Sequence, residues 1–179
     1  GISAQGHLVV AGDVLLVPTG RAVPAALRRG DGQLVYFHLQ ANGHTGGSEV
    51  VAHQDGILYV TNGEEDKIDV IDAVRGPLRF DIPLDGLLDY DGLNSVAVSG
   101  DLIAVAVETF PDSELADGWV AFYDLEGRFI NAAAVGNLPD MVTFSEDGTM
   151  AFSRAGPDRK TRMNVMKMIE KVMAKLSTR

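Results

Sequence analysis

Histidines and a glycine-rich loop are the first features of this sequence that could support chemistry. Apart from carboxylates, the side chains able to bind a first-row metal are four histidines, at positions 7, 38, 44 and 53. No two stand four residues apart, the spacing that places two ligands on one helix face, and no zinc motif is present. His44 lies in the most glycine-rich loop, residues 42–48, whose backbone N–H groups could meet a ligand. We therefore take His44 as a candidate ligand-binding residue, with a plain connection between strands as the alternative.

Acidic residues offer two further candidate sites. Asp85, Asp89 and Asp91 are close in sequence and could gather around calcium, which prefers several oxygen ligands. Their spacing is not that of an EF-hand, so solvated turns are the simpler explanation. Glu108 ends an apolar run and Asp140 directly follows a proline, and both are candidates to line a ligand-binding surface. No Gly-x-Ser-x-Gly motif occurs, so we expect no esterase of that class.

Strands must position these candidates, because the first 156 residues consist of short apolar runs separated by Gly, Asp or Asn. The runs predict strands at residues 7–11, 14–18, 25–28 and 34–38; 49–53, 57–61, 67–71 and 78–82; 95–98, 102–107, 119–123 and 129–133; and 141–144 and 150–153. Four-stranded units that recur about every 40 to 47 residues are typical of β-propeller blades. We predict an all-β fold, a partial β-propeller of about three and a half four-stranded blades, with a β-sandwich as the alternative.

The composition changes after residue 156. Residues 159–179 hold seven of the 15 basic residues and only one of the 25 acidic ones. Apolar residues recur there at spacings of three and four, which predicts a basic amphipathic α-helix over residues 157–179 whose apolar face carries Met166, Ile169, Met173 and Leu176. We expect this helix to cover the open end of the incomplete propeller. Docking to a membrane surface or to a partner protein is one alternative, and a disordered or non-native tail is another.

Composition bounds the remaining possibilities. The chain has 179 residues, 46% of them hydrophobic and 22% charged, which indicates a globular protein able to bury one substantial core. A formal net charge of -10 argues against binding to nucleic acid. The absence of cysteine excludes disulfides, thiolate nucleophiles and cysteine-ligated metal sites. No apolar run approaches the roughly 18 residues of a membrane-spanning helix. The first residue is glycine, so we expect a processed or truncated start.

Several segments between residues 47 and 156 follow the order and spacing of a known family. They include Ser48-Glu49-Val50-Val51-Ala52-His53, Leu58-Tyr59-Val60-Thr61-Asn62-Gly63, Leu93-Asn94-Ser95-Val96-Ala97-Val98 and Gly136-Asn137-Leu138-Pro139-Asp140-Met141. By these segments, residues 47–156 resemble the choice-of-anchor I family, bacterial propeller proteins usually predicted to be secreted or surface-attached. Residues 1–46, with Val17-Pro18-Thr19-Gly20-Arg21, are similar to a blade of the pyrroloquinoline-quinone-type repeat proteins.

The resemblance implies a β-propeller-like domain over residues 1–156, followed by the helix of residues 157–179. It also implies a secreted, periplasmic or cell-surface location, and it supplies no catalytic residues. We therefore expect a non-catalytic module that binds a protein or small molecule or has a structural role. The alternatives are a remnant of a propeller enzyme, either phosphoesterase-associated or quinoprotein-like, and an adaptor that docks through residues 159–179. Calcium is the only cofactor that the residues suggest. Because unpaired strand edges need a partner, either a homodimer or the helix would complete the fold.

Overall fold

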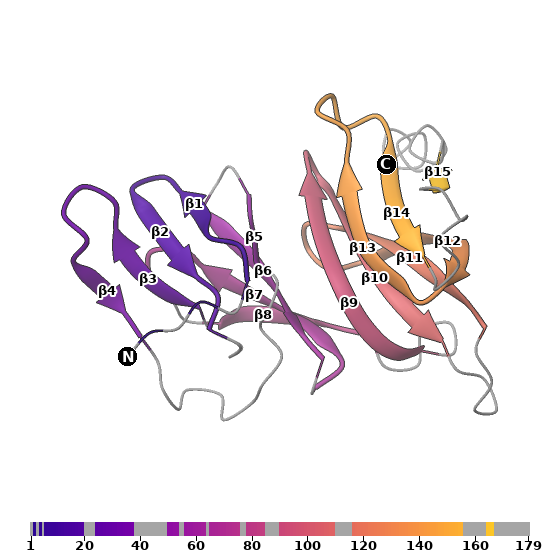
Figure 1. Cartoon of the computed structure of the whole chain (residues 1–179), viewed down its shortest axis with the longest axis horizontal. Coiled ribbons are helices and arrows are strands. Elements are labelled where there is room, and N and C mark those ends of the chain that lie inside the picture. The colour runs from indigo at the N-terminus through magenta and orange to yellow at the C-terminus, as the bar shows by residue number, and fades with distance from the viewer. Residues whose placement is uncertain are drawn as a thin grey trace. The chain divides into compact units, whose positions relative to one another are not determined.

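A computed structural model of the chain describes residues 2, 4, 6–19, 24–37, 50–53, 56–63, 65–75, 78–84, 90–109, 116–155 and 164–166. Every helix or strand assigned in these residues is a β-strand, so the predicted all-β class is confirmed for this part of the chain (Figure 1). None of the described residues form a helix long and apolar enough to cross a membrane. The chain divides into two compact units, Gly1–Asp85 and Gly86–Arg179.

The first unit holds two four-stranded antiparallel sheets in which sequence neighbours pair. The first sheet has the strand order β1-β2-β3-β4 and the second has β5-β6-β7-β8. The strands are β1 (Val9–Ala11), β2 (Val14–Val17), β3 (Ala25–Arg28) and β4 (Leu34–Tyr36), then β5 (Val50–Ala52), β6 (Ile57–Asn62), β7 (Lys67–Asp72) and β8 (Leu78–Pro83). This simple up-and-down order is the one expected of propeller blades.

The second unit repeats the pattern. It contains the third and fourth sheets of the chain. The third sheet has the strand order β12-β11-β10-β9, and the fourth has three strands in the order β13-β14-β15. The strands are β9 (Tyr90–Ser99), β10 (Leu102–Thr109), β11 (Asp117–Asp124) and β12 (Phe129–Asn137), then β13 (Pro139–Phe144), β14 (Ala151–Ala155) and β15 (Asn164–Met166). Among the described residues, three four-stranded sheets and one three-stranded sheet agree with the predicted three and a half blades.

The predicted C-terminal helix is wrong at the three residues of that segment that the structure describes. Met166, expected on the apolar face of the helix, instead ends β15, which pairs antiparallel with β14. The free edge of β14 offers backbone N–H and C=O groups, and a strand satisfies them where a helix cannot. The other three residues of the predicted face, Ile169, Met173 and Leu176, lie outside the described residues.

Glycine and aspartate make the tight turns between strands. Gly12 and Gly100 have φ values of 58° and 54° and open the two-residue turns that join β1 to β2 and β9 to β10. The favoured hairpin turns need positive φ at this position, which glycine adopts without steric cost. In other turns a carboxylate accepts hydrogen bonds from backbone N–H groups two to four residues further on, as Asp31, Asp72, Asp124 and Asp147 do. Much of the acidic excess therefore stabilises turns.

The turn at Asp147 leads to a testable pH dependence. The Ser145 hydroxyl, then the Thr149 backbone N–H and hydroxyl, donate hydrogen bonds that lower the pKa of Asp147 from 3.8 to about 2. A carboxyl whose pKa is lower in the folded state stabilises it above the unfolded-state pKa, and this contribution is lost as pH falls through the folded value. We expect the pH-dependent part of the difference in melting temperature between the parent chain and Asp147→Asn to be constant above about pH 5, to shrink as pH falls, and to disappear only below about pH 2. Melts of both chains across this range test it, with Glu146→Gln as the control. A difference that does not change with pH would contradict the assignment.

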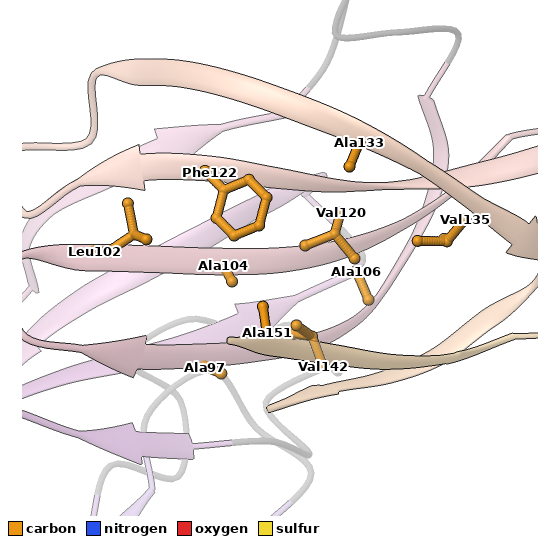
Figure 2. Close-up of a cluster of buried hydrophobic side chains, with 10 residues drawn as sticks. All are labelled: Ala97, Leu102, Ala104, Ala106, Val120, Phe122, Ala133, Val135, Val142 and Ala151. Carbon is orange, nitrogen blue, oxygen red and sulfur yellow. The ribbon is translucent and has the colours of Figure 1, made fainter. Parts of the chain in front are cut away.

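A core forms in each unit where two sheets pack face to face. In the first unit, Val14 and Leu16 of β2 belong to one buried cluster with Leu58 and Val60 of β6. In the second unit the cluster contains Ala97, Leu102, Ala104, Ala106, Val120, Phe122, Ala133 and Val135 from the third sheet and Val142 and Ala151 from the fourth (Figure 2). The many alanines let the third and fourth sheets approach closely, and Phe122 is the largest side chain in this cluster.

Candidate functional site

A groove of about 790 Å³ opens where the first and second sheets meet, within the first unit. Its first wall follows a row of paired residues across the first sheet, in which Ala11 pairs with Val14 and Val14 with Arg28. The β1–β2 turn and two valines, Val10 and Val35, extend this wall. The second wall comes from turns of the second sheet and consists of His53, Gly56, Ala73 and Val74.

Hydrogen bonds fix the rim of the groove. Arg29 donates from its backbone N–H to Asp13 O (2.9 Å) and from its guanidinium to Gly12 O (2.9 Å), which holds the β1–β2 turn. On the second wall, the Ala73 N–H donates to Gly56 O (2.9 Å), and the buried Tyr36 hydroxyl donates to Ala73 O (3.1 Å). Burial, together with the charge of Asp72, raises the pKa of Tyr36 to about 12, so the hydroxyl stays a donor at neutral pH. The groove is therefore preformed.

The lining of the groove is mainly apolar, with a few charges at its edge. Val10, Val35 and Val74 are exposed, and 62% of the Val74 surface is open to solvent. The guanidinium of Arg28 is paired with the Asp31 carboxylate at 2.8 Å. Exposed aliphatic side chains beside fixed backbone groups suit an apolar ligand with polar ends. Burial of the apolar surface of such a ligand against these side chains makes the binding free energy more favourable.

A polar cluster around the buried Asp69 in the second sheet was not anticipated from the sequence. The Lys67 ammonium lies 2.5 Å from Glu65, 3.3 Å from Asp81 and 3.5 Å from the buried Asp69. Asn62 donates to Asp69 at 3.0 Å, and burial raises the pKa of the Asp69 carboxyl despite that hydrogen bond and the lysine charge. The sequence signal for this cluster was the alternation of Lys67 and Asp69 on one strand. Asn62, on the neighbouring strand, pairs with Lys67. This lysine already occupies the space between the carboxylates.

Glu108, a predicted ligand-binding residue, takes part in a contact between three strands. The Asn94 side-chain amide on β9 donates to the Glu108 carboxylate on β10 and to the Pro139 carbonyl on β13 (3.0 Å for the latter). Asp140, the second predicted residue, follows Pro139 and is exposed. The structure thus brings Glu108 next to the segment that carries Asp140, and the contact with Asn94 joins the third sheet to the fourth.

The other predicted residues are separated or undescribed. His44, Asp85 and Asp89 lie outside the described residues, and Asp91 is an exposed residue of β9. Within the described ranges, no group of three or more His, Asp or Glu side chains is arranged to hold a metal ion. The calcium site therefore stays a prediction. The groove was not predicted from the sequence, because its walls come from segments that are far apart in the chain. Val10 and Val74, for example, are more than 60 positions apart.

Sheets of this order and packing define a β-propeller-type protein. The choice-of-anchor I domain matches residues 49–154, more than half of the chain, which therefore belongs to that family. The match confirms the resemblance predicted over residues 47–156. None of the curated proteins compared with this sequence matches it.

Solved structures share the fold at low sequence identity. The chain is similar to the computationally designed Ika4 protein (18% identity, TM-score 0.60), covering 92% of this chain and 94% of that one. It is also similar to two β-propeller proteins. They are BamB from Moraxella catarrhalis (15% identity, TM-score 0.64) and the quinohemoprotein alcohol dehydrogenase ADHIIG from Pseudomonas putida HK5 (15% identity, TM-score 0.65). The match covers 84% of this chain in each case, but only 40% and 28% of those proteins. The quinoprotein neighbour agrees with the repeat type predicted for residues 1–46.

Proposed function

We propose that this chain is a non-catalytic binding module of a secreted or surface-associated bacterial protein, and that its groove takes an apolar segment of a partner protein. The observation that carries the proposal is the preformed groove with its exposed valines, Val10, Val35 and Val74. Soluble proteins seldom leave several aliphatic side chains exposed around one concavity without a use for them. Membership of the choice-of-anchor I family supports the surface-associated location.

The hydrogen bonding of the acidic residues supports binding over catalysis. Asp124 accepts from two backbone N–H groups and from the Arg128 guanidinium (2.6 Å), so it closes a turn. Asp69 is held by Asn62 and Lys67, and Glu108 is held by Asn94. A general acid or base must reach a substrate proton, and these carboxylates are oriented toward their own fold. A remnant of a propeller enzyme is the alternative function.

Peptide binding to the chain tests this proposal. Dye-labelled pentapeptides, blocked at both ends and with leucine or phenylalanine at the centre, should raise fluorescence anisotropy, whereas a serine-centred peptide should not. Val74→Glu should weaken binding at least about tenfold, because it removes apolar contact and places a charge in the groove. Leu8→Glu, an exposed leucine that does not line the groove, is the matched control. Equal affinity of the Val74→Glu and parent chains, or no binding of either apolar peptide, would contradict the proposal.

A further inference from the structure

Strand β1 forms one edge of the first sheet, whose strand order is β1-β2-β3-β4 (Figure 1). Val10 and Ala11 of β1 line the groove, and Val10 is 52% exposed. The edge of a sheet presents backbone N–H and C=O groups that no neighbouring strand satisfies. The backbone of β1, as well as the exposed valine side chains, is therefore available to a ligand in the groove.

The register of the β1–β2 hairpin determines which backbone groups face outward. Ala11 pairs with Val14 across a two-residue turn, and such a closing pair exchanges both of its backbone hydrogen bonds. Hydrogen-bonded and non-hydrogen-bonded pairs alternate along an antiparallel ladder, so the next pair, Val10 with Leu15, is of the second kind. The N–H and C=O of Val10 therefore point away from β2, toward the open edge. Among the described residues, none forms a hydrogen bond with either group.

The two edges of the first sheet differ in how they are built. On β4, Val35 is an extra residue between Leu34 and Tyr36, which both pair with β3, so the register shifts there. A bulge of this kind twists an edge and discourages pairing with another strand. β1 instead pairs with β2 in regular register, and its residues Val9–Ala11 include neither a charge nor a proline. β1 thus lacks the usual protection of an edge strand.

We propose that the partner segment in the groove is an extended strand that pairs with the free edge of β1. The pairing rests on the proposed function and specifies how the segment binds. The Val10 N–H donates to one carbonyl of the segment, and the Val10 C=O accepts from one of its amide N–H groups. Arg29 donates to Gly12 O and Asp13 O and so holds the β1–β2 turn beside this edge. The backbone contacts orient the segment, and the groove valines select for apolar side chains.

Singly N-methylated peptides test the pairing. Three versions of the leucine-centred pentapeptide carry the methyl group on the amide nitrogen of the second, third or fourth residue. Successive N–H groups of a strand point to opposite sides. Either the central methyl group alone, or one or both of the flanking ones without it, should therefore weaken binding at least about tenfold. Weakening by methyl groups on adjacent residues, or by none of the three, would overturn the pairing.

Two substitutions at Val10 separate the contribution of its backbone from that of its side chain. Val10→Pro removes the outward N–H, and an edge strand accepts proline where the N–H takes no part in the ladder. Val10→Ala keeps the N–H but removes more apolar surface than the proline ring does. Val10→Pro should weaken binding of the leucine-centred peptide at least about tenfold, and Val10→Ala should weaken it less. Equal effects or the reverse order, with unchanged circular dichroism spectra, would overturn the proposal.

Hydrogen exchange at the Val10 amide of the parent chain separates this inference from the proposed function. With the leucine-centred peptide at saturation, the Val10 N–H should exchange at least about tenfold more slowly, and with the serine-centred peptide it should exchange as in the free chain. If the leucine-centred peptide binds while Val10 exchange is unchanged, the groove still binds an apolar segment and the strand pairing is overturned. If neither apolar peptide binds, the proposed function fails and the pairing fails with it.

Discussion

Replacement of Phe122 with alanine should lower the free energy of unfolding by about 3–5 kcal/mol, the range for a large aromatic removed from a core. Phe122 is fully buried between the third and fourth sheets, where its neighbours include several alanines (Figure 2). Alanines cannot extend into the space that the ring leaves, so the cavity should persist. Chemical denaturation followed by circular dichroism measures the loss.

Phe129 provides the matched control for this substitution. It lies in the same sheet but is 48% exposed, and its ring meets Tyr123 edge to face with 5.7 Å between centroids. Phe129→Ala should therefore cost no more than about 1.5 kcal/mol, the size of one aromatic pair. If the two substitutions had equal effects, the core would not lie between the third and fourth sheets as described.

Replacement of Gly118 with alanine should also destabilise the second unit, by about 1–3 kcal/mol as for an overpacked core. A Cβ atom on Gly118 would lie 2.5 Å from Pro139 Cδ and 2.6 Å from the Val107 carbonyl oxygen. One of these neighbours is backbone and the other a rigid ring, so the strands themselves must separate. The shift would also strain the hydrogen bond from Asn94 to Pro139 O.

Gly30→Ala is the control for this second substitution. A Cβ atom on Gly30 would have no heavy atom within 4 Å, and this glycine lacks a positive φ, so the added methyl group meets open space. Its effect on the free energy of unfolding should stay within about 0.5 kcal/mol. A Gly118→Ala chain as stable as Gly30→Ala would mean that β11 and β13 do not approach as closely as the structure shows.

The strand pattern was predictable because the turns have clear chemical signals. Glycine and aspartate mark the hairpins, and the apolar runs between them are too short for helices. Strand ends were harder to place. β9 begins at Tyr90 rather than at the predicted residue 95, and it includes the polar stretch Asp91, Gly92 and Asn94. Those residues extend the strand because they pair with the end of β10 across register shifts at Ala106 and Glu108. Such pairing depends on a distant segment and leaves no local pattern.

The candidate sites were predictable only in part. Glu108 was identified as a notable carboxylate from its place at the end of a strand, and the structure adds its partner Asn94, which is 14 residues away. The groove could not be predicted, because Asp13, His53 and Val74 come from separate turns that each look solvated in the sequence. Helical spacing of apolar residues around Met166 was misleading, since pairing with the edge of β14 determined the local structure instead.

A methyl NMR titration tests the central claim that this chain binds an apolar segment through its groove. The chain would carry ¹³C-labelled valine methyl groups and would be titrated with the leucine-centred pentapeptide. We predict that the largest shift changes fall on Val10, Val35 and Val74, and that Val107, near Glu108, stays unchanged. Saturable changes centred on Val107, with the groove valines unaffected, would contradict the claim and direct attention to the Glu108 contact instead.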